Sequence, residues 1–125
     1  MKALILAALV AAGVLSASVA AEAVEMYTLP VTVDDNEFVS CHIANVSAQT
    51  RSFTFEIIDT TGTIRASGQN TLLAGQIGGG GIGVGTSGGL FYCHFSAAGQ
   101  KTNWRAAIKR SATAFGGDLI VSPAE

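Results

Sequence analysis

The sequence predicts an all-β fold, a two-sheet antiparallel sandwich of about seven or eight short strands. Apolar residues alternate at period two through most of the chain, and Thr, Val, Ile and Phe dominate the alternating stretches. Turn signals separate these stretches at regular spacing, which favours a sandwich and leaves a small barrel as the second choice. Two cysteines lie in the middle of two such stretches, so one disulfide between strands completes the prediction.

Residues 1–20 have the layout of a secretory signal peptide. Lys2 gives a positive start, an apolar run of 13 residues follows it, and 16 of these 20 residues are apolar. The run is too short to span a bilayer about 30 Å thick. Small side chains predict cleavage before Ala21, or alternatively before Val24. We therefore expect a secreted or periplasmic protein with no membrane span after cleavage, and residues 21–125 as a single domain.

The charge of the expected mature chain argues against a role in binding nucleic acid. The whole chain has seven Lys and Arg residues against nine Asp and Glu residues. Removal of the leader takes Lys2 with it, which leaves a net charge of −3 with both histidines neutral. Proteins that bind nucleic acid usually have a basic surface instead.

The first strand is expected at residues 27–33 and the second at residues 37–45. Pro30 cannot donate a ladder hydrogen bond, so the first strand belongs at the edge of a sheet. In the second stretch, alternate residues share the face that is expected to point into the core: Val39, Cys41 and Ile43.

A hairpin is expected next, with strands at residues 51–59 and 63–67 joined by the turn signal Asp-Thr-Thr-Gly. Glu56 should point to water. Alternation points five apolar residues of the hairpin into the core: Phe53, Phe55, Ile57, Ile64 and Ala66.

A short strand at residues 71–73 precedes a glycine-rich segment, residues 75–89, in which nine of the 15 residues are glycine. Glycine loses the most conformational entropy on folding and has no side chain to bury. The segment is therefore expected as a loop or an edge strand. Its order has to come from three residues: Ile77, Ile82 and Val84.

Two further strands are expected at residues 90–96 and 103–110, and the first of them should be central in its sheet. Their core-facing residues are Phe91, Cys93, Phe95, Trp104, Ala106 and Ile108. A last strand near residues 118–121 follows a Gly-Gly turn at residues 116–117.

Cys41 and Cys93 both lie in mid-strand on the expected core face, which in an exported chain predicts a structural disulfide. The bridge would close a loop of roughly 50 residues and contribute on the order of 4 kcal/mol. The spacing resembles the inter-sheet bridge of immunoglobulin-like domains, with Phe53 or Phe55 where that family has Trp and Phe91 where it has Tyr. The chain is also similar in general character to small secreted bacterial sandwich proteins. The resemblance implies a sandwich fold and no particular activity.

Each cysteine is followed by a histidine, and a repeated Cys-His pair is a reason to consider a zinc or copper site. Neighbouring residues on a strand point to opposite faces, so core-facing cysteines place His42 and His94 on the outside. The histidines can approach one another only if their two strands pair in one sheet. We expect no metal and no cofactor, and keep a small metal-binding protein using His42/His94 as an alternative function.

Residues 34–37, Asp-Asp-Asn-Glu, form an oxygen-rich turn. Carboxylate-rich loops can bind calcium, but the residue spacing of an EF-hand is absent from this turn. We expect it to be a solvated turn.

Tyr92 and His94 share the outward face of the expected central strand. Arg105 points outward from the following strand, because its neighbour Trp104 is expected in the core. If these two strands pair, Tyr92, His94 and Arg105 form a polar and aromatic binding surface.

The sequence contains no convergent set of catalytic residues, since it has no G-x-S-x-G elbow and both histidines follow core cysteines. We expect a secreted, non-enzymatic β-sandwich that serves as a binding, adhesion or envelope-associated module. A glycan or an envelope protein is the expected kind of partner. A further hypothesis is an assembly subunit that completes a neighbour's sheet by strand addition, through its glycine-rich segment or its N-terminal strand.

Overall fold

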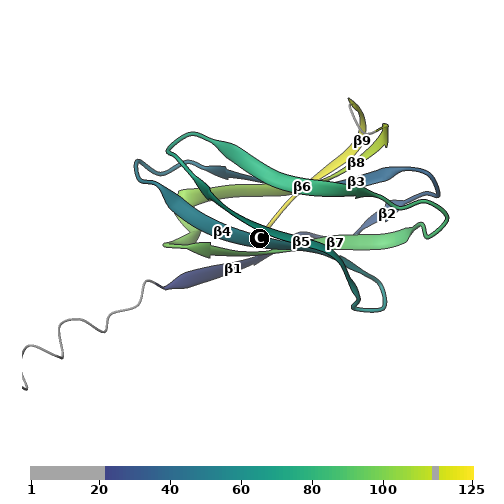
Figure 1. The fold of residues 1–125 in the computed structure, drawn as a ribbon, viewed down its shortest axis with the longest axis horizontal. Helices are drawn as coiled ribbons and strands as arrows, with labels where there is room; N and C mark the ends of the chain where they lie inside the picture. Colours follow the sequence, from purple (N-terminus) through teal and green to yellow (C-terminus); the bar gives the residue numbers. More distant parts are fainter. Residues whose placement is uncertain (1–21, 114–115) are drawn as a thin grey trace, which may run out of the picture.

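The chain folds into two β-sheets that pack face to face (Figure 1). The computed structural model describes residues 22–113 and 116–125. The predicted signal peptide, residues 1–20, lies outside the described residues. Within the part of the chain that is described, no helix is long and apolar enough to cross a membrane.

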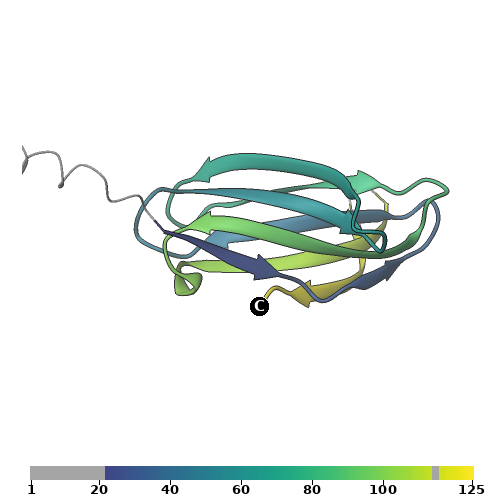
Figure 2. The same cartoon turned by 90° about the horizontal axis from the view of Figure 1, so that it is seen from below.

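The larger sheet has five strands in the order β1-β7-β4-β5, with β2 also paired to β7. The strand expected at residues 27–33 is instead two strands, β1 and β2, which follow one another along the same edge of β7 (Figure 2). Pro30 lies between them, at the sheet edge where it was expected. β7 pairs on its other side with β4, so the predicted central strand is confirmed. The strands are β1 (Ala23–Tyr27), β2 (Val31–Val33), β4 (Arg51–Asp59), β5 (Ile64–Leu72) and β7 (Gly89–Ala98).

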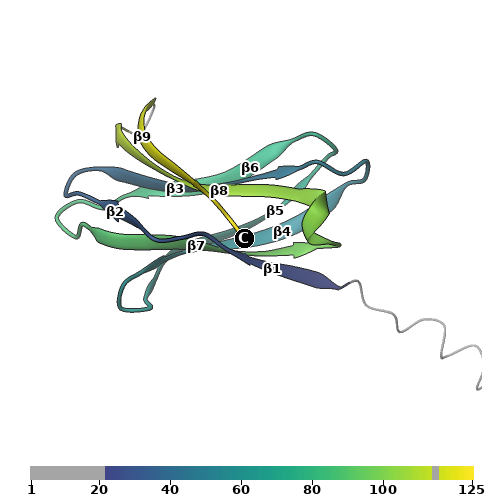
Figure 3. The same ribbon diagram turned by 180° about the vertical axis from the view of Figure 1, so that it is seen from behind.

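The smaller sheet has four strands in the order β6-β3-β8-β9, all antiparallel (Figure 3). A short 3-10 helix, Lys101–Asn103, leads from β7 into β8. The predicted Gly-Gly turn at residues 116–117 is instead the start of β9. The strands are β3 (Phe38–Asn45), β6 (Ile77–Gly83), β8 (Trp104–Thr113) and β9 (Gly116–Pro123).

The core lies between the sheets and is built by the predicted alternation. Trp104 is buried, packs edge-on against Phe53 with ring centroids 6.1 Å apart, and donates from Nε1 to the carbonyl of Ala98. A buried indole N–H needs such a partner. The other predicted core residues that are buried are Val39, Cys41, Ile43, Phe55, Ile57, Phe91, Cys93, Phe95 and Ile108.

A disulfide between Cys41 of β3 and Cys93 of β7 joins the two sheets across this core. Both cysteines are fully buried, and their Cα atoms are 5.9 Å apart. The prediction of an all-β, two-sheet antiparallel sandwich with one disulfide between strands is therefore confirmed. The described residues form nine strands, and β1 and β2 share one position in their sheet.

The predicted hairpin forms, but its return strand differs from the prediction. The expected strands at residues 63–67 and 71–73 are one continuous strand, β5. The register shifts between Ile57 and Ile58, which leaves one extra residue, Arg65, in β5. An extra residue reverses the faces of the side chains before it relative to those after it. Ile64, predicted to point inward, is for this reason 53% exposed.

The glycine-rich segment is an edge strand, β6, paired with β3. Gly79 has φ +134°, and a Cβ there would overlap the carbonyl oxygen of Cys41. On the inner face, a Cβ on Gly80 would lie 2.8 Å from the ring of Phe55. The strand thus needs glycine where it lies against the core. Of its three predicted anchors, Val84 is buried and Ile82 packs against the core, whereas Ile77 is 72% exposed.

Candidate functional site

The outer face of the five-stranded sheet has a central row of interacting side chains. The register places Tyr27 of β1 and Glu56 of β4 on either side of His94 of β7. Side chains at these positions point away from the core, because their strand neighbours point into it. We call Glu25, Tyr27, Glu56 and His94 the histidine row.

His94 is held by a carboxylate at each ring nitrogen. Nδ1 lies 2.7 Å from Glu56 Oε1, and Nε2 lies 2.6 Å from Glu25 Oε2. The hydroxyl of Ser96 donates to the other oxygen of Glu25 at 3.1 Å. A carboxylate only accepts hydrogen bonds, so the two contacts are satisfied together when both ring nitrogens donate, which is the imidazolium form.

The protonated state of His94 is favoured by these contacts. Burial lowers the pKa of His94, but hydrogen bonds and charge attraction from Glu56 and Glu25 raise it by more, so the pKa lies above its ordinary value of 6.5. The contacts of the row therefore stabilise the imidazolium form of His94.

Tyr27 covers the imidazole. The two rings are stacked, with centroids 4.5 Å apart and planes inclined by 10°. Tyr27 is nevertheless 50% exposed. One side of the phenol ring therefore supports His94, and the side chain still presents a large flat surface to solvent.

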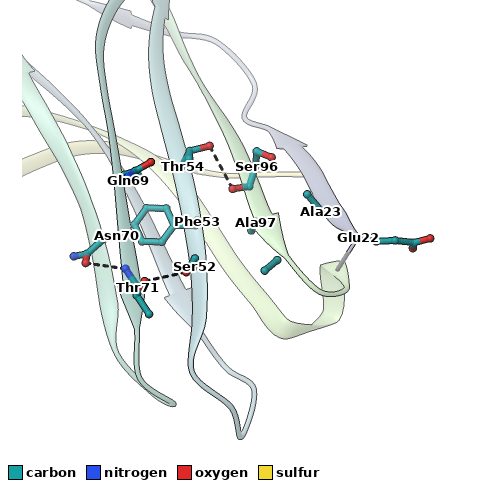
Figure 4. Close-up of a pocket in the computed structure, with 11 residues that line it drawn as sticks. Glu22, Ala23, Ser52, Phe53, Thr54, Gln69, Asn70, Thr71, Ser96 and Ala97 are labelled. Atoms are coloured by element: carbon teal, nitrogen blue, oxygen red, sulfur yellow. Dashed lines mark hydrogen bonds between the residues drawn. The ribbon is translucent and has the colours of Figure 1, made fainter. Parts of the chain in front are cut away.

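A hollow of about 440 Å³ lies beside the histidine row, over the ends of β1, β7, β4 and β5 (Figure 4). Its walls include hydroxyls and amides that are bonded to one another or to the backbone. Ser52 and Thr71 hydroxyls are 2.9 Å apart, and the Thr54 hydroxyl donates to the carbonyl of Ser96 at 3.5 Å. Gln69 and Asn70 also line the hollow. Its described lining contains one charged residue, Glu22.

A second hollow of about 380 Å³ lies at the opposite end of the same sheet, where it is lined by Pro30, Leu90, Tyr92 and the β4–β5 turn. That turn projects away from the sandwich in Figure 1. Asp59 shapes it by accepting from the backbone of Thr61 and its hydroxyl at 2.9 and 2.6 Å. These bonds lower the pKa of Asp59 despite some opposing burial.

The predicted surface of Tyr92, His94 and Arg105 does not form. Tyr92 and His94 share the outer face of β7, but Arg105 lies on β8 in the other sheet. β7 and β8 do not pair, so Arg105 points from the opposite side of the sandwich, where it donates to the carbonyl of Trp104. The alternation of side chains along a strand predicts which face each residue occupies, but it does not predict which strands pair.

His42 and His94 do not share a site either. His42 lies on β3 of the four-stranded sheet, and His94 lies on β7 of the five-stranded sheet. Their outward directions are therefore opposite, which excludes one metal ion bound by both. Among the described residues, no group of three or more His, Cys, Asp or Glu side chains is arranged to hold a metal ion.

The acidic turn at residues 34–37 forms ion pairs with the side chain of Arg110. Arg110 donates from Nε to Glu37 and from Nη2 to Asp34, both at 2.8 Å. The hydrogen bond from Arg110 lowers the pKa of Glu37. Asp35 accepts from the backbone of Gly88 at 2.9 Å. Residues 34–36 are exposed, so the turn is solvated as expected. The ion pairs with Arg110 also link this β2–β3 turn to β8.

The sequence did not predict Glu25, Tyr27 or the contact of Glu56 with His94 as parts of this site. Glu56 was correctly placed on the outer face, but its carboxylate binds His94 instead of facing water alone. Tyr27 lay inside the predicted edge strand. Only the register of β1 against β7, which pairs Tyr27 with His94, shows that the two rings meet.

No family model and no curated protein matches the chain. Among solved structures, the fold is similar to the crystal structure of Thermotoga maritima 1070, with a TM-score of 0.56 and 6% sequence identity. The match covers 83% of this chain and 94% of that chain. At this identity the similarity concerns the fold alone. The resemblance to immunoglobulin-like domains stays a prediction.

Proposed function

We propose that the protein is an exported, non-enzymatic binding module, and that the outer face of its five-stranded sheet binds a neutral glycan chain. One observation carries the proposal. The half-exposed ring of Tyr27 is fixed on His94 between two carboxylates, and hollows lie on both sides of it.

Export is supported by the leader-like residues 1–20 and by the disulfide. Disulfides form and persist in oxidising compartments such as the periplasm and the cell exterior. A buried bridge between the two sheets is a structural one, so such a compartment favours the folded domain.

A neutral glycan fits the chemistry of this face. Sugar rings offer apolar C–H faces that pack on an aromatic ring, and hydroxyls that donate to and accept from side-chain oxygens and amides. Tyr27 supplies the ring, Glu25 and Glu56 supply acceptors already held in place, and the first hollow supplies hydroxyls and amides. A hollow of about 440 Å³ lies within the size range of small-ligand sites. The carboxylates disfavour an anionic ligand.

The same contacts favour binding over catalysis. A histidine acts as a general base through a ring nitrogen with a free lone pair. Both nitrogens of His94 are engaged by carboxylates, and the nearby hydroxyl of Ser96 donates to Glu25 instead of to the histidine. A serine nucleophile needs its hydroxyl to donate to the histidine, and the Ser96 hydroxyl does not do so in the histidine row.

Titration with neutral hexasaccharides tests the proposal directly. Cellohexaose, chitohexaose and xylohexaose would be added to the isotopically labelled protein while backbone amide NMR signals are followed. We expect shifts at β1, β4, β5 and β7, and an affinity at least about tenfold weaker in Tyr27→Ala. His42→Gln on the opposite face is the matched control and should bind as the wild type does.

Two results would contradict the proposal. The first is a titration in which none of the three glycans shifts the signals of the five-stranded sheet. The second is hydrolysis of a glycoside or an ester by the purified protein that is lost in Ser40→Ala. The Ser40 hydroxyl lies 2.8 Å from Nε2 of His42, so turnover of that kind would assign the chemistry to the other face.

A further inference from the structure

The edge strand β6 is unusual because its own residues supply none of the usual protection for an unpaired edge. Within the described residues, its ladder partner is β3 alone, so the backbone groups on its other side are not paired with a strand. β5 of the other sheet approaches β6 without pairing with it. Proteins usually protect such an edge with charges, proline or a bulge. β6 contains none of these, and no Asp, Glu, Lys or Arg lies between Arg65 and Lys101.

We propose that β6 pairs with β6 of a second copy of this chain, antiparallel and centred on Gly80, to form a two-fold symmetric dimer. The two four-stranded sheets then continue as one sheet across the interface. This inference is independent of the glycan-binding face, which lies on the other sheet.

The sequence of β6, Ile-Gly-Gly-Gly-Gly-Ile-Gly, is complementary to itself in this register. Residues directly opposite one another in an antiparallel pair lie on the same face of the sheet. The register between the two copies must therefore place outward residues opposite outward residues. Ile77, Gly79, Gly81 and Gly83 pair with outward residues of β3, and the alternate residues pair with core residues. A two-fold axis at Gly80 meets this condition, because it places outward residues opposite outward residues and inward residues opposite inward ones.

In that register every isoleucine lies opposite a glycine. Ile77 of one copy faces Gly83 of the other on the outer side, and Ile82 faces Gly78 on the inner side. No two large side chains compete for the same space. The four consecutive glycines at the centre allow the backbones to approach without side-chain contact.

The outer surface also has a place for the exposed isoleucine. Ile77 is 72% exposed in the single chain. A hollow of about 590 Å³ runs along the outer side of β6 and β3, with Phe38 and Gly83 among its lining residues. The proposed pairing brings Ile77 of the second copy to Gly83, where it packs against Phe38 and loses its contact with water.

The two-fold arrangement closes on itself. Both copies use the same edge, so pairing leaves no β6 edge open to a third copy. A dimer, and not a fibre, is the expected product at this strand.

Sedimentation equilibrium of the purified, disulfide-bonded protein from micromolar to millimolar concentration tests the inference. We expect a monomer–dimer equilibrium, with Ile77→Lys weakening the dimer about tenfold or more, because a charge at an edge opposes pairing. Ile64→Lys is the matched control: Ile64 is also the exposed first residue of a strand, but it lies in β5. It should leave the equilibrium unchanged.

Amide hydrogen exchange locates the contact. The amides of Gly78–Gly81 that do not bond to β3 should become protected as the concentration rises, and lose this protection in Ile77→Lys. A chain that stays monomeric up to millimolar concentration overturns the proposal. So does a dimer that survives Ile77→Lys with the exchange of β6 amides unchanged, since it would use another surface.

Discussion

The two Cys-His dipeptides, at residues 41–42 and 93–94, have the same local sequence but different surroundings in the two sheets. Their cysteines meet in the core as one disulfide, and their histidines point outward from opposite sides of the sandwich. By sequence the two sites are equivalent. In the folded protein they have little in common beyond the bridge.

The difference comes from the neighbouring strands. His94 lies between Tyr27 and Glu56, which stack on it and bind it. His42 lies between Gly79 and Ala107, which offer no ring and no charge. Its Nε2 is 2.8 Å from the hydroxyl of Ser40, two residues away on its own strand. The cross-strand partners, and not the dipeptide, decide what each histidine can do.

Removing the bridge should have the largest effect, because it is the feature that the two sites share. We expect the double substitution Cys41→Ala with Cys93→Ala to lower the free energy of unfolding by about 2–5 kcal/mol. Urea denaturation of the variant and the oxidised wild type measures this difference. Equal stability of the two proteins would show that packing alone holds the sheets together.

A side chain at position 79, beside His42, should be the next most damaging change. Gly79→Ala forces a Cβ against the carbonyl of Cys41 at a backbone angle that favours glycine, so we expect a loss of about 2–4 kcal/mol. Gly85→Ala is the control: its φ is +59°, but a Cβ there meets open space, so about 1 kcal/mol is expected. Thermal unfolding would rank the two. A milder effect at position 79 than at position 85 would contradict the close packing of β6.

The pH dependence of stability sharpens the contrast between the histidines. The pKa of His94 is raised in the folded protein. The contribution of its contacts to the free energy of unfolding is therefore fully present below the unfolded-state pKa of 6.5, and it is lost as the pH rises through the folded-state pKa. The groups that face it are Glu25 of β1, Glu56 of β4 and the Tyr27 ring.

We therefore expect the unfolding midpoint of the wild type to fall as the pH rises from about 6.5. His94→Gln should remove most of this slope, and His42→Gln should leave it in place. Urea denaturation at a series of pH values measures both. A slope that follows His42 instead would mean that the histidine row is not ionised as its geometry indicates.

Much of this architecture could be predicted because period-two alternation is a local property. The core residues of β3, β4 and β7 and the edge position of Pro30 follow from side-chain parity and proline chemistry. The disulfide followed from two cysteines on core faces in a chain with a leader. The extra residue Arg65 interrupts the alternation in β5, so the prediction that Ile64 points into the core is wrong.

The candidate site could be predicted only in part, because it depends on which strands pair and in what register. The all-β class, the two core cysteines and the outward direction of the histidines depend on neighbours along one strand, so the sequence predicts them. Tertiary structure alone decided that Tyr27 and two carboxylates surround His94, and that Arg105 lies on the far side. Strand order is a global choice among many pairings, and no residue encodes its partner in a distant strand by local pattern alone.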